Sequence, residues 1–288
     1  MQSTFTVHSG VGVQHRRRTA PFQGAVGKFF NLHRALNEEE IAGLMKSMPI
    51  PVLPSTDPGI ELFKSPEGQL GAQAWLAGSY QIRSARGKTT RFEVQDRPKS
   101  LEIIGPWELS FPPKWGAPSQ VTLPQLISWS EYPEPGVKYF SGPASYAKTF
   151  VLTDDWTKSQ QRVYLDLGKV CVMAQVELNG VQLGTLWKPP FRVEITNALK
   201  PGNNQLRVQV VNLWVNRMIG DEELPADSER NSNGTLKEWP QWLKDGQASS
   251  TGRYTFTSWP LWKKGARLQE SGLLGPVRLR ASRVIALN

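Results

Sequence analysis

The sequence has few of the residues that most often mark a metal or redox site. Its 288 residues include one cysteine, Cys171, and three histidines, which all lie within the first 33 positions. A single cysteine excludes an intramolecular disulfide, and its place in a strand-like run is typical of a small buried residue. No histidine lies at metal-ligand spacing from a carboxylate or a cysteine, so we predict no metal site and no cofactor.

Long apolar runs are also lacking, and no stretch approaches the length needed to cross a bilayer. We therefore expect no membrane partner. Met1 to Gly10 are polar and mixed, without the apolar core of a secretory signal. The localisation of the protein is left open.

Dense positive charge is confined to one short run. The net charge is +9, and Arg16 to Arg18 with His15 form its only basic cluster. No zinc-ligand spacing or RNA-binding signature accompanies this cluster, which favours a solvated tail and predicts no nucleic-acid partner.

Turn residues and alternating apolar residues are abundant. The chain has 25 glycines and 22 prolines, as an all-β protein rich in turns would. Between residues 172 and 178 every second residue is apolar, and Asn179-Gly180 follows, the pair best suited to a tight hairpin turn. A similar alternation over Leu206–Val210 has one polar face, which predicts antiparallel strands rather than an α/β barrel.

These patterns predict an all-β fold in three parts. Residues 1–60 form an N-terminal region with one helix from Asn37, either disordered or the remnant of a larger domain. Residues 61–99 form a small β hairpin unit or linker. Residues 100–288 form a jelly-roll β-sandwich whose strands include 145–152, 162–167 and, last, 272–280.

A series of motifs in one order carries a family resemblance. They are Gly105–Trp107, Pro135–Gly142, Leu165–Gly168, Glu177–Gly180, Leu186–Phe191, Asn212–Glu222, Leu236–Trp242 and Ser271–Pro276. Together these motifs resemble the C-terminal region of bacterial α-L-rhamnosidases of glycoside hydrolase family 106. Their core is also similar to the galactose-binding-like domain of glycoside hydrolase family 2. The resemblance covers about residues 66–281.

The resemblance implies an accessory, carbohydrate-associated β-sandwich of a rhamnosidase-like glycoside hydrolase. In that family the catalytic carboxylates lie on a (β/α) barrel upstream, and this sequence has no counterpart of it. No catalytic residue is carried over. The implied partner is a plant-type oligosaccharide or a separate catalytic barrel, and the parent family is often secreted or periplasmic. Alternatives are a docking domain without sugar affinity and a self-contained glycosidase.

Tryptophan is concentrated in the second part of the chain, where ten of the 11 tryptophans follow residue 100. Indole rings stack on sugar rings, and indole and guanidinium groups are also enriched at protein interfaces. The long segment 216–262 interrupts the strand pattern, as functional loops often do. We predict that a carbohydrate-binding or docking surface comprises Trp187, Asn216, Arg217, Asp221, Glu222, Trp239, Trp242, Arg253 and Trp259.

Asp221, Glu222 and Glu223 form the tightest acidic cluster near these aromatic residues. A glycosidase needs two carboxyl groups that flank the scissile bond, and the second would have to come from elsewhere. The favoured alternative is a solvated loop, or a carboxylate paired with Arg217 or Arg230. We expect the tryptophans of the segment to form an exposed face, because a sandwich that already buries Trp107 and Trp214 has little room for more.

Overall fold

The computed structural model describes Glu39 and residues 59–287, apart from residues 66, 67, 85, 86, 97 and 158–160. The chain divides into two units, Met1–Thr56 and Asp57–Asn288. Glu39 lies in the first unit, and all other described residues lie in the second. The helix predicted from Asn37, like the N-terminal region around it, lies outside the described residues.

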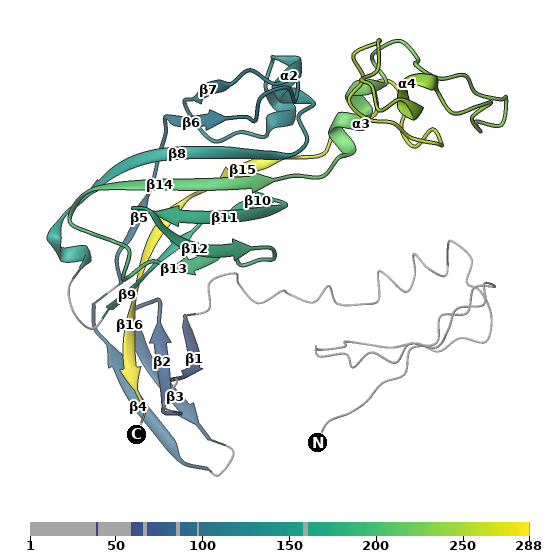
Figure 1. The fold of residues 1–288 in the computed structure, drawn as a ribbon. Helices are drawn as coiled ribbons and strands as arrows, with labels where there is room; N and C mark the ends of the chain where they lie inside the picture. Colours follow the sequence, from purple (N-terminus) through teal and green to yellow (C-terminus); the bar gives the residue numbers. More distant parts are fainter. Residues whose placement is uncertain are drawn as a thin grey trace. The chain divides into compact units, whose positions relative to one another are not determined.

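Two six-stranded antiparallel sheets make up the second unit (Figure 1). The first sheet runs in the order β1 (Ile60–Lys64), β2 (Leu70–Ala74), β16 (Arg278–Ala286), β9 (Gln161–Asp166) and β13 (Arg192–Glu194), and β5 (Ser100–Glu102) also pairs with β16. The second runs in the order β12 (Val181–Leu186), β11 (Met173–Leu178), β14 (Gly202–Val211), β8 (Pro143–Leu152), β6 (Trp107–Ser110) and β7 (Gln120–Leu123).

Smaller elements complete the unit. Two further strand pairs are β10 (Lys169–Cys171) with β15 (Gly272–Gly275), and β3 (Gly78–Arg83) with β4 (Thr89–Val94). The helices are α2 (Pro135–Lys138), α3 (Val215–Asp221) and α4 (Gln241–Lys244), with the 3₁₀ turns η1 (Trp129–Glu131) and η2 (Asp154–Trp156). Within the described part of the chain, no helix combines the length and apolarity needed to cross a membrane.

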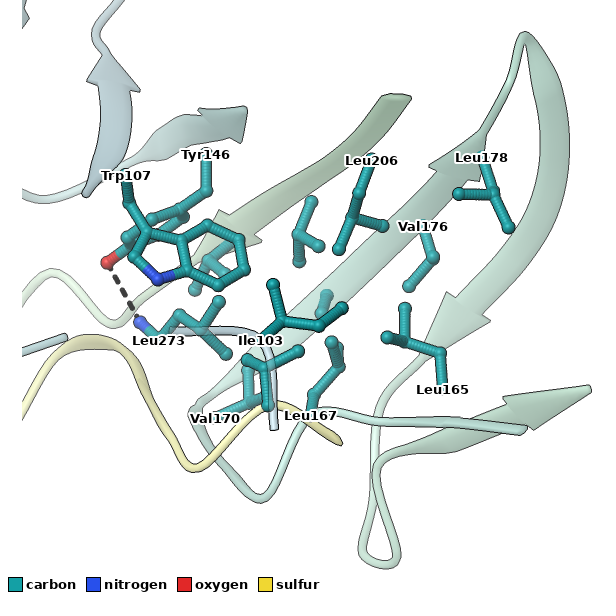
Figure 2. Packing of buried hydrophobic residues seen from close by; sticks show 14 of the residues in the cluster. Ile103, Trp107, Tyr146, Leu165, Leu167, Val170, Val176, Leu178, Leu206 and Leu273 are labelled. Atoms are coloured by element: carbon teal, nitrogen blue, oxygen red, sulfur yellow. Dashed lines mark hydrogen bonds between the residues drawn. The ribbon is translucent and has the colours of Figure 1, made fainter. Parts of the chain in front are cut away.

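The core lies between the two large sheets. Alternate residues of β14, such as Leu206 and Val208, are buried, and they belong to the same apolar cluster as Leu165 of β9 (Figure 2). Trp107 is fully buried in this cluster, as expected. Period-two alternation places every second side chain on one face, so each strand contributes one apolar side. The predicted all-β sandwich is therefore confirmed.

The Asn179-Gly180 turn joins β11 to β12 as predicted, with φ values of 53° and 83°. The Asn179 side chain also joins neighbouring loops. Its amide donates to the Ala198 carbonyl at 2.8 Å and to Asn204 Oδ1 at 2.9 Å, and its oxygen accepts from the Gln205 N–H at 2.9 Å. Asn179 thus fixes the register of the β11–β12 hairpin against β14.

Two substitutions of Asn179 should separate the contribution of its side-chain hydrogen bonds from that of its left-handed backbone conformation. Asn179→Ala removes three side-chain hydrogen bonds and strains a left-handed position, so we expect it to lower the free energy of unfolding by about 3 kcal/mol. Asn179→Gly keeps the left-handed turn and should cost about 1 kcal/mol less. Urea unfolding of both variants measures the difference. Equal losses would show that the backbone conformation does not matter at this position.

The C-terminal strand differs from its prediction. Residues 272–280 were expected as one strand, but β15 and β16 are separate and pair with different partners. Pro276 lies between them and has no N–H to donate to a ladder. The chain therefore leaves β15 at Gly275 and enters the large sheet at Arg278.

The first four strands of the described unit form two hairpins, and one of these hairpins joins the sandwich. The predicted hairpin is confirmed as β3 and β4, with Tyr80 stacked on Phe92 at a ring-centroid distance of 5.5 Å. β1 and β2 add to the edge of β16. The predicted domain boundaries near residues 60 and 100 stay predictions.

Candidate carbohydrate-binding or docking surface

The segment that carries most of the predicted site follows the end of β14 and contains α3 and α4 (Figure 1). Its first turn is fixed to the sandwich. The amide of Asn212 accepts from the Gly142 N–H and donates to the Phe140 carbonyl, both at 2.8 Å. Ser141 Oγ donates to the Leu213 carbonyl at 2.9 Å and accepts from the Arg217 N–H at 3.1 Å. α3 therefore starts from a rigid support.

Asn216 is buried and connects α3 to the return of the chain. Its amide nitrogen donates to the Gln269 carbonyl at 2.7 Å, and its oxygen accepts from the Gln269 N–H at 2.8 Å. Both polar atoms of the side chain are used internally. Asn216 thus anchors the chain just before β15.

Asp221 holds the middle of the segment against α3. Its Oδ2 accepts from the Tyr254 N–H at 3.0 Å and from the Thr255 N–H and Oγ1, both at 2.7 Å. Its Oδ1 lies 3.0 Å from Arg217 Nε, with both side chains buried. The Arg217 Nε–H does not point at Oδ1, so this contact is an ion pair without a hydrogen bond. The interpretation of a paired carboxylate holds for Asp221.

Arg253 fixes the chain on the other side of α3. It pairs with Glu222 Oε1 at 3.0 Å and donates to the carbonyls of Leu224 at 3.0 Å and Pro225 at 2.8 Å. Arg230 also holds parts of this segment together, because it donates to the carbonyls of Gly234, Thr257 and Ser258. A segment with almost no regular secondary structure is therefore ordered by buried or half-buried charged groups.

The predicted aromatic residues divide into exposed and packed rings. Trp239 and Trp259 are 55% and 49% exposed, whereas Trp242 is half-buried and donates its Nε1–H to the Asp227 carbonyl at 3.2 Å. Trp187 is 67% exposed but follows β12, outside this segment. The structure thus gathers eight of the nine predicted residues into the segment after β14, and the role of all nine stays a prediction.

Three further aromatic residues, Trp115, Trp214 and Tyr254, extend this surface. Trp214 was expected in the core, but it is 50% exposed, and its expected burial is wrong. It lies at the cap of α3, where the chain has already left β14, and stacks on Trp115 at 6.0 Å. Tyr254 is 51% exposed. The glycine and proline residues around Trp115 favour a loop, and this pattern could have predicted that Trp115 lies near the surface.

The space beside Arg253 is narrow. A crevice beside Arg253, lined also by Glu222, Asp227, Arg230 and Trp262, has about 20 Å³ of space, enough for one water molecule. Among the described residues, no three His, Cys, Asp or Glu side chains gather as a metal site. Cys171 is half-buried, and burial raises the pKa of its thiol. The segment after β14 thus presents an open aromatic surface and not an enclosed pocket beside Arg253.

Residues 137–272 match a family model described as the glycosyl hydrolase 2 galactose-binding domain-like family. These residues are therefore similar to that galactose-binding-like domain, and the predicted galactose-binding-like β-sandwich is confirmed as the fold class. The match includes α3 and ends at the start of β15.

A protein of Formosa agariphila, provisionally named beta-glucuronidase, is 42% identical over 212 residues, which are 73% of this chain and 18% of that protein. A solved rhamnosidase from Novosphingobium sp. PP1Y superposes with a TM-score of 0.53 at 24% identity, over 85% of this chain and 26% of the rhamnosidase. A β-glucuronidase from Ruminococcus gnavus gives a TM-score of 0.40 at 18% identity, over 66% and 30% of the two chains. This chain thus spans a small part of the proteins that it resembles.

Proposed function

We propose that this galactose-binding-like domain is a non-catalytic accessory module of a carbohydrate-degrading glycoside hydrolase. One observation carries the proposal: two of the three carboxylates in the acidic cluster nearest the aromatic surface are held in ion pairs with arginines of the same segment. Asp221 is fully buried against Arg217, and Glu222 is paired with Arg253. A glycosidase needs one carboxyl group to give up a proton and a second to act at the anomeric carbon, and carboxylates held in internal ion pairs do not offer that chemistry.

The substrate class of the parent enzyme follows from similarity. The relatives bear the names rhamnosidase and beta-glucuronidase, so we propose a polysaccharide that contains rhamnose or glucuronic acid. The resemblance to family 106 α-L-rhamnosidases favours rhamnose. Because this chain spans 18% of one relative and 26% of another, the catalytic barrel would be supplied from outside the described domain.

Purified full-length chain should release no nitrophenol from 4-nitrophenyl α-L-rhamnoside or 4-nitrophenyl β-D-glucuronide above the buffer rate. The reason is that its tightest acidic cluster near the aromatic surface is structural. Absorbance at 405 nm over several hours is the measurement. Turnover that Glu222→Gln abolishes, while Glu223→Gln leaves it intact, would overturn the proposal and identify a self-contained glycosidase.

A docking domain without sugar affinity is the second candidate. Exposed aliphatic side chains favour it, because Leu213 is 53% and Leu261 is 60% exposed, and neither offers a flat face to a sugar. Apolar side chains gathered on a surface are typical of protein interfaces. The experiment in the next subsection distinguishes the two candidates.

A further inference from the structure

Trp214 presents one indole face to solvent and is supported on the other. Half of its surface is exposed, and it stacks on Trp115 at 6.0 Å with an angle of 29° between the rings. Trp115 lies directly over Gly142, where an added Cβ would be 2.4 Å from the ring. Trp214 is therefore fixed in place before any ligand arrives, which lowers the entropy lost on binding.

Trp239 is arranged in the same way. It is 55% exposed and packs against Phe256 at 5.5 Å, with the rings inclined by 39°. Phe256 in turn contacts the edge of Trp242 at 5.9 Å. Because Trp242 is anchored through Asp227, this second indole face also rests on a fixed support.

Tyr254 connects the two supported indoles. It is half exposed, and the Arg217 guanidinium lies over its ring at 5.1 Å. Gly116, the residue after Trp115, approaches the ring so closely that an added Cβ would be 3.0 Å from it. Phe256, which supports Trp239, is two residues after Tyr254. Trp214, Tyr254 and Trp239 are thus linked through their supports, and we call them the aromatic track.

We propose that the aromatic track binds a carbohydrate chain by stacking against the apolar faces of its sugar rings. The inference rests on the proposed function, and it names a site whose first member, Trp214, lies outside the surface predicted from the sequence. Half-exposed flat rings that are held from behind suit the C–H face of a pyranose. The adjacent crevice admits only one water molecule, so an extended chain on the open surface fits better than one enclosed sugar.

The matched control is Val151, whose side chain is 70% exposed. It pairs with Asn203 at the start of β14, whereas the track residues follow the other end of β14. Replacement of Val151 by alanine removes exposed apolar surface outside the track. Any loss common to all three alanine variants would therefore reflect general surface hydrophobicity.

The test is affinity electrophoresis of the full chain in gels that contain gum arabic or rhamnogalacturonan I. We expect at least one polysaccharide to retard the wild type, and Trp214→Ala and Trp239→Ala each to raise the Kd roughly three- to tenfold. Val151→Ala should migrate like the wild type, and free rhamnose should compete weakly. Thermal unfolding should show all three variants folded, because each replaced side chain is half or more exposed.

Absence of retardation by both polysaccharides, or equal weakening by Val151→Ala, would overturn the aromatic track as a sugar site. In that case, association with the Formosa agariphila relative lacking its matching 212 residues would identify a docking surface. The accessory role would then stand while the sugar site failed. Turnover of the aryl glycosides would instead refute the proposed function.

Discussion

Replacing Asp221 by asparagine should lower the free energy of unfolding by about 3–5 kcal/mol, the usual cost of breaking a buried ion pair from one side. Asparagine keeps the shape of the side chain and one acceptor oxygen. It removes the charge that Arg217 faces at 3.0 Å, with the two side chains only 1% and 9% exposed. The remaining guanidinium would be buried without a counter-ion.

Thermal and urea unfolding measure this effect, and a melting temperature lower by about 10 °C is expected for a domain of this size. Glu223→Gln is the control, because Glu223 pairs with Lys264 at 3.4 Å on the surface. An exposed pair contributes about 0–1 kcal/mol. Similar losses in both variants would show that the buried pair is not what holds the segment after α3.

Tyr146→Phe should be the second most damaging of the proposed substitutions, at about 2–5 kcal/mol. Tyr146 is fully buried, and its hydroxyl accepts from the Leu273 N–H at 2.9 Å (Figure 2). It also accepts from Trp129 Nε1 at 2.6 Å. Phenylalanine fills the same space but leaves two buried donors unpaired. The link between β8 and β15 would be lost with them.

The same substitution should change the response to high pH. Burial raises the pKa of Tyr146 above the ordinary value of 10, so the folded state keeps a proton that the unfolded state releases. Stability from this residue is complete below pH 10 and falls above it. The advantage of the wild type over Tyr146→Phe should therefore shrink by about 1.4 kcal/mol per pH unit between pH 10 and 11.5.

Tyr164→Phe is the matched control for this experiment. Tyr164 is half-buried and donates to Gln73 Oε1 at 3.1 Å, and its loss should cost about 1 kcal/mol. Burial also raises the pKa of Tyr164. A Tyr146→Phe variant no less stable than Tyr164→Phe would show that Trp129 and Leu273 find other acceptors.

The order of neighbouring residues along the chain made much of the sandwich predictable. The positive φ values of Asn179 and Gly180 follow from those two residues alone, because few other pairs tolerate such a turn. Alternating apolar residues likewise identified the buried face of β14, because side chains in a strand point to opposite sides in turn. Pro276 shows the limit, since one strand was predicted where the chain changes partners.

The candidate surface was only partly predictable. The sequence indicated an aromatic, charged segment after β14, and most of the predicted residues lie there. It did not reveal that Asn216 and Asp221 face inward. Their partners, Gln269 and Thr255, are 53 and 34 residues away along the chain, and no local pattern encodes such contacts.

The sequence by itself determined the β-sandwich class, the tight hairpin at Asn179 and the acidic, tryptophan-rich segment, because each depends on neighbouring residues. The tertiary structure alone decided which side chains of that segment remain available. Trp214 is exposed because the chain leaves β14 before it, and Asp221 is hidden because a distant loop folds over α3. Burial is a property of packing between remote segments, and it is packing that leaves the aromatic rings facing the solvent.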